Sequence, residues 1–229
     1  MPTSLYLAAA LLLFVSHAVP SWPGVRPALV ARLGRPGFMA LHSVLSLAAL
    51  TLFVVAYRDV DTAGDTAGFF FTPAGWAHQL AVALMPMAFV LIAARLSTKA
   101  GEPLSPREPA GIYRVTRFPG SLGLLLWAVL HLQATGDARR VVLFATMAAI
   151  ALFAMVKNDW VLRRARSAAA RTFREETSVV PFAAILAGRQ RFVWHEIGWA
   201  RLLAGVAAWA VVLEAHRFVF GVDPLYWAR

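Results

Sequence analysis

Apolar positions gather into six stretches that are almost free of charged residues. A helix that crosses a bilayer needs about 20 such residues, within a range of about 17–25. The second, third and sixth stretches have this length by themselves, whereas the first, fourth and fifth need their flanks. The six stretches run over Leu5–Pro20, Gly37–Tyr57, Trp76–Leu96, Gly120–Ala134, Val141–Val156 and Leu202–Phe220.

The connections between the stretches agree with a helical bundle. Only Thr135–Arg140 separates the fourth stretch from the fifth, which predicts a tight helical hairpin. The first stretch has no Lys or Arg before it, and its end, Ala18-Val19-Pro20, is not a small-x-small cleavage sequence. We therefore expect the first stretch to be a retained helix and not a signal peptide.

Basic residues are concentrated in alternate connections. Of the 22 Lys and Arg residues, 17 follow the first, third or fifth stretch. Cytoplasmic loops of membrane proteins carry such an excess of positive charge. We therefore expect about six transmembrane helices, with both termini outside and three basic loops in the cytoplasm, in a bacterial inner membrane. This topology accounts for the net charge of +10 without a nucleic-acid partner.

The composition supports the same fold class. Hydrophobic residues make up 59% of the chain and charged residues 15%, against about 45–50% and about 25% in soluble domains. The absence of cysteine excludes disulfides, thiolate-bound zinc, iron–sulfur clusters and covalently attached haem. We expect an all-α, polytopic membrane bundle that forms a single domain over residues 1–229.

Asn158–Ala200 is the one long segment expected outside the bilayer. Within it, Trp160–Arg174 is rich in Ala and Arg and predicts a basic amphipathic helix. We favour an interfacial helix held by anionic lipid headgroups over a specific partner site. A short helical turn is expected at Ala183–Ala187, with Gly188 ending it.

Ionisable residues at membrane depth are costly and mark functional sites. His131 lies within a long apolar run, where a neutral imidazole either bridges helices by a hydrogen bond or binds a metal or haem; both readings stay open. For His17 and His42 the hydrogen-bonding role is favoured. The other three histidines, placed at the membrane–water boundary, are His78, His195 and His216.

Catalytic motifs typical of soluble enzymes are missing from the sequence. His195-Glu196 is not followed by a second histidine at the spacing of a zinc metalloprotease, and the chain has no phosphate-binding glycine loop or nucleophile elbow.

Four segments together resemble the NnrU family of bacterial membrane proteins. The longest agreement runs from Tyr113-Arg114-Val115-Thr116-Arg117-Phe118-Pro119-Gly120 through His131-Leu132 to Gly136-Asp137. The other three are Ser16-His17-Ala18-Val19-Pro20-Ser21, Leu33–Leu47 and Thr177–Arg189. The family is named for a link to nitrite and nitric oxide metabolism in denitrifying bacteria.

The resemblance implies a cofactor. The NnrU family is similar to zeta-carotene cis-isomerase, a membrane protein that uses haem b, and the positions that match its ligands are His17 and His131. If these lie too far apart along the bundle, His42 is the substitute for His17, and His78 or His216 is the partner of His131. The family's Arg-His-Pro motif reads Arg117-Phe118-Pro119, and Thr135 replaces the usual Asn, so isomerase activity does not transfer directly.

A second resemblance is to isoprenylcysteine methyltransferases, which share an Arg-His-Pro-type motif. Their paired glutamates continue into a methyl-donor motif, whereas Glu175-Glu176 is followed by Thr177-Ser178-Val179. Three function classes therefore remain: a haem-dependent redox or isomerase protein, a non-enzymatic accessory or transport protein, and a methyltransferase. The lipid bilayer and a lipophilic small molecule are the expected partners.

The topology can be tested with reporter fusions. Fusions after Gly101 and after Arg174 should report the cytoplasm, because both follow strongly basic connections. Fusions after Asp65 and at the C-terminus should report the opposite side. A cytoplasmic C-terminus would exclude six spans.

Overall fold

The structure is a computed structural model that describes residues 3–60, 70–98, 101–102, 105–106 and 108–226. Most of the connection after the second predicted helix, residues 61–69, lies outside the described residues, as do the basic residues Lys99, Arg107 and Arg229.

Helices dominate the described part of the chain. A minimal antiparallel pair of strands, β1 (Gly101–Glu102) and β2 (Ser105–Pro106), accompanies them. The helices are α1 (Thr3–Ser21), α2 (Arg26–Asp59), α3 (Ala77–Ser97), α4 (Ile112–Val115), α5 (Pro119–Ala134), α6 (Ala138–Arg164), α7 (Ala168–Glu176), α8 (Ala183–Leu186), α9 (Trp194–Ile197) and α10 (Trp199–Phe220).

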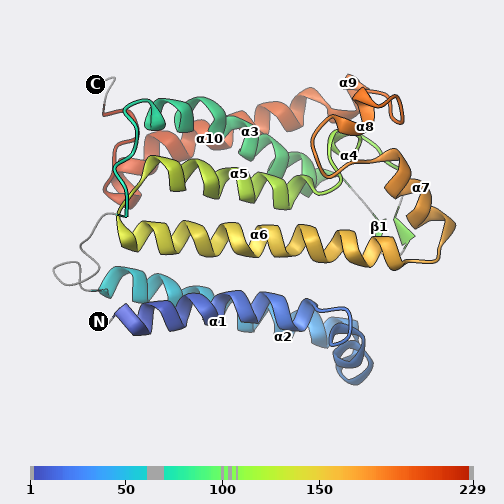
Figure 1. Ribbon diagram of the computed structural model, residues 1–229, viewed down its shortest axis with the longest axis horizontal. Helices are drawn as coiled ribbons and strands as arrows, with labels where there is room; N and C mark the ends of the chain where they lie inside the picture. The colour runs from blue at the N-terminus through green and yellow to red at the C-terminus, as the bar shows by residue number, and fades with distance from the viewer. Residues whose placement is uncertain (1–2, 61–69, 99–100, 103–104, 107, 227–229) are drawn as a thin grey trace.

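The predicted polytopic helical bundle is confirmed. Among the described residues, α1, α2, α3, α6 and α10 are long and apolar enough to cross a membrane. The fourth predicted stretch is α5, a shorter apolar helix of 16 residues that runs alongside them (Figure 1). The start of α1 and the end of α10 lie at one end of the bundle, and α4, α7, α8 and α9 lie at the other.

The second helix begins earlier than predicted. Helical structure starts at Arg26, with Pro27 in the first turn, where its missing N–H costs nothing. At Gly34 the backbone leaves the helical region, with φ 70° and ψ 164°, and a new helical segment follows with Pro36 near its start. The apolar stretch therefore marked only the part of α2 after this break.

The predicted amphipathic helix over Trp160–Arg174 is wrong in its boundaries. Helix α6 continues through Trp160 to Arg164, and a separate helix, α7, begins at Ala168. The interruption has a local cause, because the Ser167 side chain accepts a hydrogen bond from the amide of Ala170 and caps the new helix. The short turn predicted at Ala183–Ala187 is confirmed as α8, and Gly188 ends it with φ 68°.

Helix α6 is the central element of the packing. It contacts α5 on one side and α1 on the other, while α2 packs on α1 and α3 packs between α5 and α10 (Figure 1). One core joins α1, α2 and α6 around Tyr6, Leu13 and Phe53, and a second joins α3 and α5 around Met85 and Leu130. The predicted hairpin of the fourth and fifth stretches is the α5–α6 pair.

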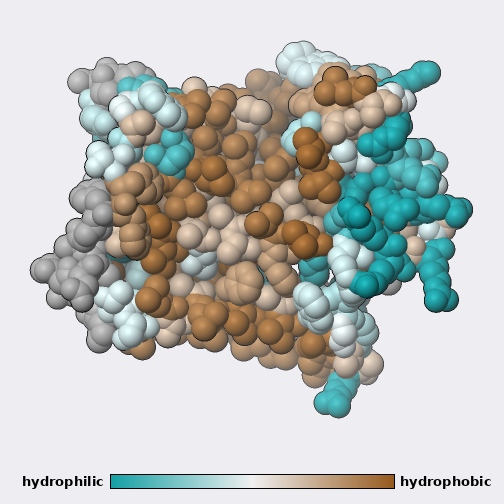
Figure 2. Space-filling model, in the orientation of Figure 1, coloured by the Kyte–Doolittle hydropathy of each residue, from teal (hydrophilic) through white to brown (hydrophobic). Residues whose placement is uncertain are grey.

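The surface divides along the bundle axis. Figure 2 shows a broad hydrophobic band over the middle of the helices and a strongly hydrophilic region at the end that carries α7. This pattern is that of a protein whose middle contacts lipid tails and whose ends contact headgroups and water.

Two glycines allow α3 to approach its neighbours closely. A Cβ on Gly205 of α10 would lie 2.6 Å from the Cα of Val90, and one on Gly123 of α5 would lie 2.8 Å from the carbonyl oxygen of Ala88. Small residues at such crossings are the usual means of tight helix packing in membranes.

Replacing Gly205 should therefore destabilise the bundle. Gly205→Val would force α10 away from the backbone of α3, at a cost of about 1–3 kcal/mol for overpacking. The measurement is thermal unfolding of the purified protein in detergent. Ala207→Val, at an exposed position of the same helix, is the control and should unfold close to wild type. Equal melting of the two variants would contradict the close contact.

Candidate functional site

His17 and His42 face each other between α1 and α2. Their ring centroids are 6.0 Å apart, and the ring planes are inclined at 72°. The Nδ1 of His17 lies 2.9 Å from the carbonyl oxygen of Leu13, and because a carbonyl only accepts, Nδ1 carries the proton and Nε2 the lone pair. The Nδ1 of His42 is buried and has no hydrogen-bond partner.

Two cations stand beside this histidine pair. Arg26 and Lys157 act electrostatically on His42, as does His17. Arg26 lies 5.8 Å from the ring of Phe38, which is stacked parallel to His42. Lys157 reaches across from α6 and donates to the carbonyl of Ser21 at 3.4 Å. The pair is thus bordered by positive charge near the C-terminal end of α1.

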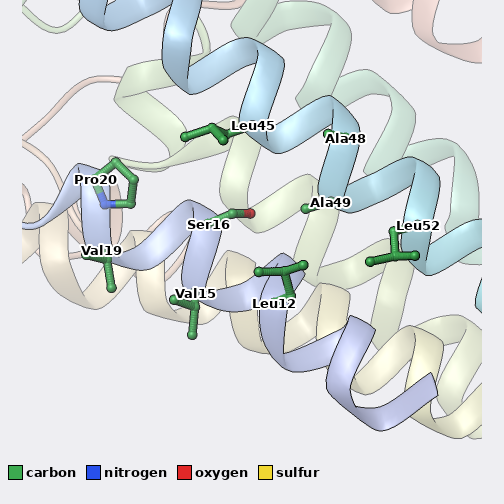
Figure 3. A pocket seen from close by; sticks show the side chains of 9 residues that line it. All are labelled: Leu12, Val15, Ser16, Val19, Pro20, Leu45, Ala48, Ala49 and Leu52. Atoms are coloured by element: carbon green, nitrogen blue, oxygen red, sulfur yellow. The ribbon is translucent and has the colours of Figure 1, made fainter. Parts of the chain in front are cut away.

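An apolar pocket of about 400 Å³ lies next to the His17–His42 pair. It lies between α1 and α2 and extends along α1 from Leu12 to Pro20 (Figure 3). Ser16 contributes a hydroxyl to a lining otherwise made of hydrocarbon, and that hydroxyl lies 3.3 Å from Nδ1 of His17. A flat or elongated apolar molecule would suit such a lining.

His131 forms a second pair, with His216 of α10. The ring centroids are 6.5 Å apart and the planes are inclined at 16°. Nδ1 of His131 donates to the carbonyl of Trp127 at 2.8 Å, and Nδ1 of His216 donates to that of Val222 at 2.9 Å. Both Nε2 atoms therefore carry a lone pair. Phe144 of α6 stacks on His131 at 4.4 Å.

The structure does not bring His17 and His131 together. Around His17, α1 contacts α6 at Phe153, whereas His131 contacts α6 at Phe144. Nine residues of helix separate these levels by about 14 Å. Two ligands of one iron need nitrogen atoms about 4 Å apart, since a metal–imidazole bond is about 2 Å long. Each predicted ligand instead lies beside a different histidine.

The remaining histidines lie apart from these pairs. His78 makes an edge contact with Tyr226 at 5.3 Å, and His195 is exposed on α9. Among the residues that the structure describes, no group of three or more His, Asp or Glu side chains is placed to hold a bare metal ion.

At the end of the bundle that carries α7, the guanidinium of Arg117 forms a buried set of contacts that we call the Arg117 clasp. It is paired with Asp159 of α6, it donates through Nε to the Thr177 hydroxyl at 2.9 Å, and it donates to the carbonyls of Arg174 and Thr177 at 2.7 and 2.8 Å. Burial lowers the pKa of Arg117 while Asp159 opposes that shift, and arginine stays charged. The clasp joins the start of α5 to the ends of α6 and α7.

A second ion pair fixes the start of α10. Arg114 donates from Nε and NH2 to the two carboxylate oxygens of Glu196 at 2.8 and 2.9 Å, and the Gly111 amide adds a third bond at 2.7 Å. The hydrogen bond from Arg114 holds the pKa of Glu196 below its usual range. Forked pairing of this kind fixes orientation as well as charge.

The two departures from the family pattern lie next to helix starts. Phe118, in place of the motif histidine, is the residue before α5 and is half-buried. The Thr135 hydroxyl donates to Asp137 at 2.9 Å, and Asp137 caps α6 by accepting from the Arg140 amide. The Arg117 clasp was not predicted, although Asp159, an acid at the end of an apolar stretch, was a signal for it.

These features define a polytopic helical membrane protein with paired histidines and a buried ionic clasp at one end of its bundle. The model of the NnrU protein family matches residues 6–224, and the chain belongs to this family. A segment of 81 residues is 33% identical to the chloroplastic 15-cis-zeta-carotene isomerase of Zea mays. That segment is 35% of this chain and spans only 22% of the maize protein. No solved structure matches the chain.

Breaking the Arg117 clasp should strongly destabilise the fold. Arg117→Ala leaves Asp159 buried with only its exposed partner Arg163, and the expected loss is about 3–5 kcal/mol. Arg117→Lys should not restore stability, because one ammonium cannot reach acceptors placed for a planar fork.

Thermal unfolding in detergent measures the effect. Arg163→Ala is the matched control, because its side chain is 67% exposed, and it should cost less than about 1 kcal/mol. An Arg117→Ala variant as stable as Arg163→Ala would contradict a stabilising clasp.

Proposed function

We propose that this protein is a haem b protein of the membrane, with His17 and His131 among its iron ligands. The observation that carries the proposal is the His17–His42 pair: two imidazoles 6.0 Å apart, one of them with a buried, unpartnered Nδ1. Two imidazoles on opposite sides of one iron have ring centroids about 6 Å apart, given metal–nitrogen bonds of about 2 Å. An iron would also satisfy a nitrogen that now lacks a partner.

The surroundings of the pair fit the rest of a haem b group. Arg26 and Lys157 would pair with its propionates, and Phe38 would cover its edge. The pocket between α1 and α2 would place apolar side chains beside the group. Arginine and lysine are suited to this task because both hold carboxylates by charge-assisted hydrogen bonds.

His131 is the second proposed ligand, and His216 beside it would supply another ligand nitrogen. Backbone carbonyls hold both Nδ1–H groups, which is how metal-ligating histidines are oriented in proteins. The spacing of 6.5 Å and the aromatic walls supplied by Trp127, Phe144 and Phe220 support a haem there too.

When bound, haem held by two histidines supplies one-electron redox chemistry without an open coordination position. What this chain's residues add is an open, apolar pocket lined in part by Ser16, the neighbour of His17, in which a lipophilic molecule would lie beside the site. We therefore propose a role in the redox-dependent conversion of a lipophilic polyene, the substrate class in the maize relative's name. A role in nitric oxide metabolism, from the family's name, is the alternative.

The experiment is expression with haem supplied, followed by purification and absorption spectroscopy. We expect a Soret band and two haems per chain. His17→Ala and His42→Ala should each remove one haem, and His131→Ala and His216→Ala the other. His78→Ala and His195→Ala are the controls and should keep both, because neither lies in a histidine pair.

Other outcomes would correct the proposal. One haem per chain, lost in both His17→Ala and His131→Ala but kept in His42→Ala and His216→Ala, would mean that the first two share one iron after a rearrangement. Protein that purifies without haem would end the proposal and favour an accessory protein, or a methyltransferase if it binds a methyl donor. New bands when nitric oxide is added to the reduced protein would favour the alternative function.

A further inference from the structure

One face of α6 forms a groove near the end of the bundle that carries α7. The groove has a volume of about 420 Å³. Its lining residues lie one helical turn apart along α6, joined by Val179 of the segment after α7: Leu152, Met155, Val156, Asp159, Trp160 and Arg163. Apolar side chains line the groove towards the middle of the bundle, and polar side chains line it at the end that carries α7.

Two guanidinium groups are fixed at the polar end. Arg163 donates through Nε to Asp159 at 2.6 Å, and its side chain remains 67% exposed. Arg164 lies 3.8 Å from the ring centroid of Trp160, a cation–π contact that holds it beside the groove. Tryptophan is the residue type that prefers the headgroup level of a bilayer.

The charges at this end do not cancel. Asp159 is the carboxylate within the groove, and it is already paired with the buried Arg117. Arg163 and Arg164 therefore present positive charge to a ligand. The groove combines an apolar slot that faces the bilayer with two cations at headgroup height.

We propose that this groove is a binding site for an anionic phospholipid of the cytoplasmic leaflet. The phosphate would pair with Arg163 and Arg164, and one acyl chain would lie along Leu152, Met155 and Val156. The groove also includes Val179, so a bound lipid would bridge α6 and the segment after α7, two of the elements that the Arg117 clasp joins. This binding differs from a general attraction of anionic lipids to basic loops, because the groove would hold both the headgroup and one acyl chain.

Native mass spectrometry of the delipidated protein tests the site. We expect phosphatidylglycerol to bind more tightly than phosphatidylcholine with the same chains. The double variant Arg163→Gln, Arg164→Gln should weaken phosphatidylglycerol binding about 25-fold, since each arginine near the surface contributes about 1 kcal/mol, or about five-fold. Arg166→Gln with Arg171→Gln removes the same charge from exposed positions outside the groove and should have little effect.

A second variant separates chain binding from charge. Val156→Trp fills the groove at a position that is 63% exposed, so it should weaken binding without unfolding the protein, whereas Val211→Trp on α10 is the control. Inorganic phosphate at millimolar concentration should not compete, because it lacks the chain. Equal affinity for the two lipids, equal loss in the two arginine double variants, or displacement by phosphate would overturn the proposal.

Discussion

The buried guanidinium of Arg117 decides how the end of the bundle that carries α7 is assembled. Its side chain pairs with a carboxylate on α6 and donates hydrogen bonds to acceptors at the end of α7. Its backbone amide donates to the carbonyl oxygen of Ser178 at 2.7 Å. Arg117 lies two residues before α5, so the clasp sets where that 16-residue helix begins relative to α6. A helix too short to span a bilayer unaided is thereby held in register with longer neighbours.

Helix α6 then divides the molecule. Because α1 and α5 pack on different sides of it, the bundle has two separate interhelical spaces, each with its own histidine pair. One pair is bordered by cations and an apolar pocket, and the other by aromatic rings. Four of the histidines therefore lie in two separate pairs.

The sequence named the histidines of the candidate site, but it did not show which histidine lies beside which. An imidazole within an apolar run signals a functional residue, and this singled out His131. The sequence placed His42 and His216 as substitutes, but it could not show that they lie beside His17 and His131, because such contacts depend on which helices are neighbours. The ion pair of Arg114 with Glu196 escaped prediction for the same reason, since its partners are 82 residues apart.

The sequence by itself determined the helical class, the apolar spans, the short hairpin connection and the charge asymmetry between the two ends. These follow from local physics: in hydrocarbon the backbone must satisfy its own hydrogen bonds, and the apolar length required is fixed by the bilayer. Tertiary structure alone decided the close approach of α3 and α10 at Gly205 and the Arg117 clasp. Each of these depends on atoms brought together from distant parts of the chain, and hydropathy along the sequence carries no information about that arrangement.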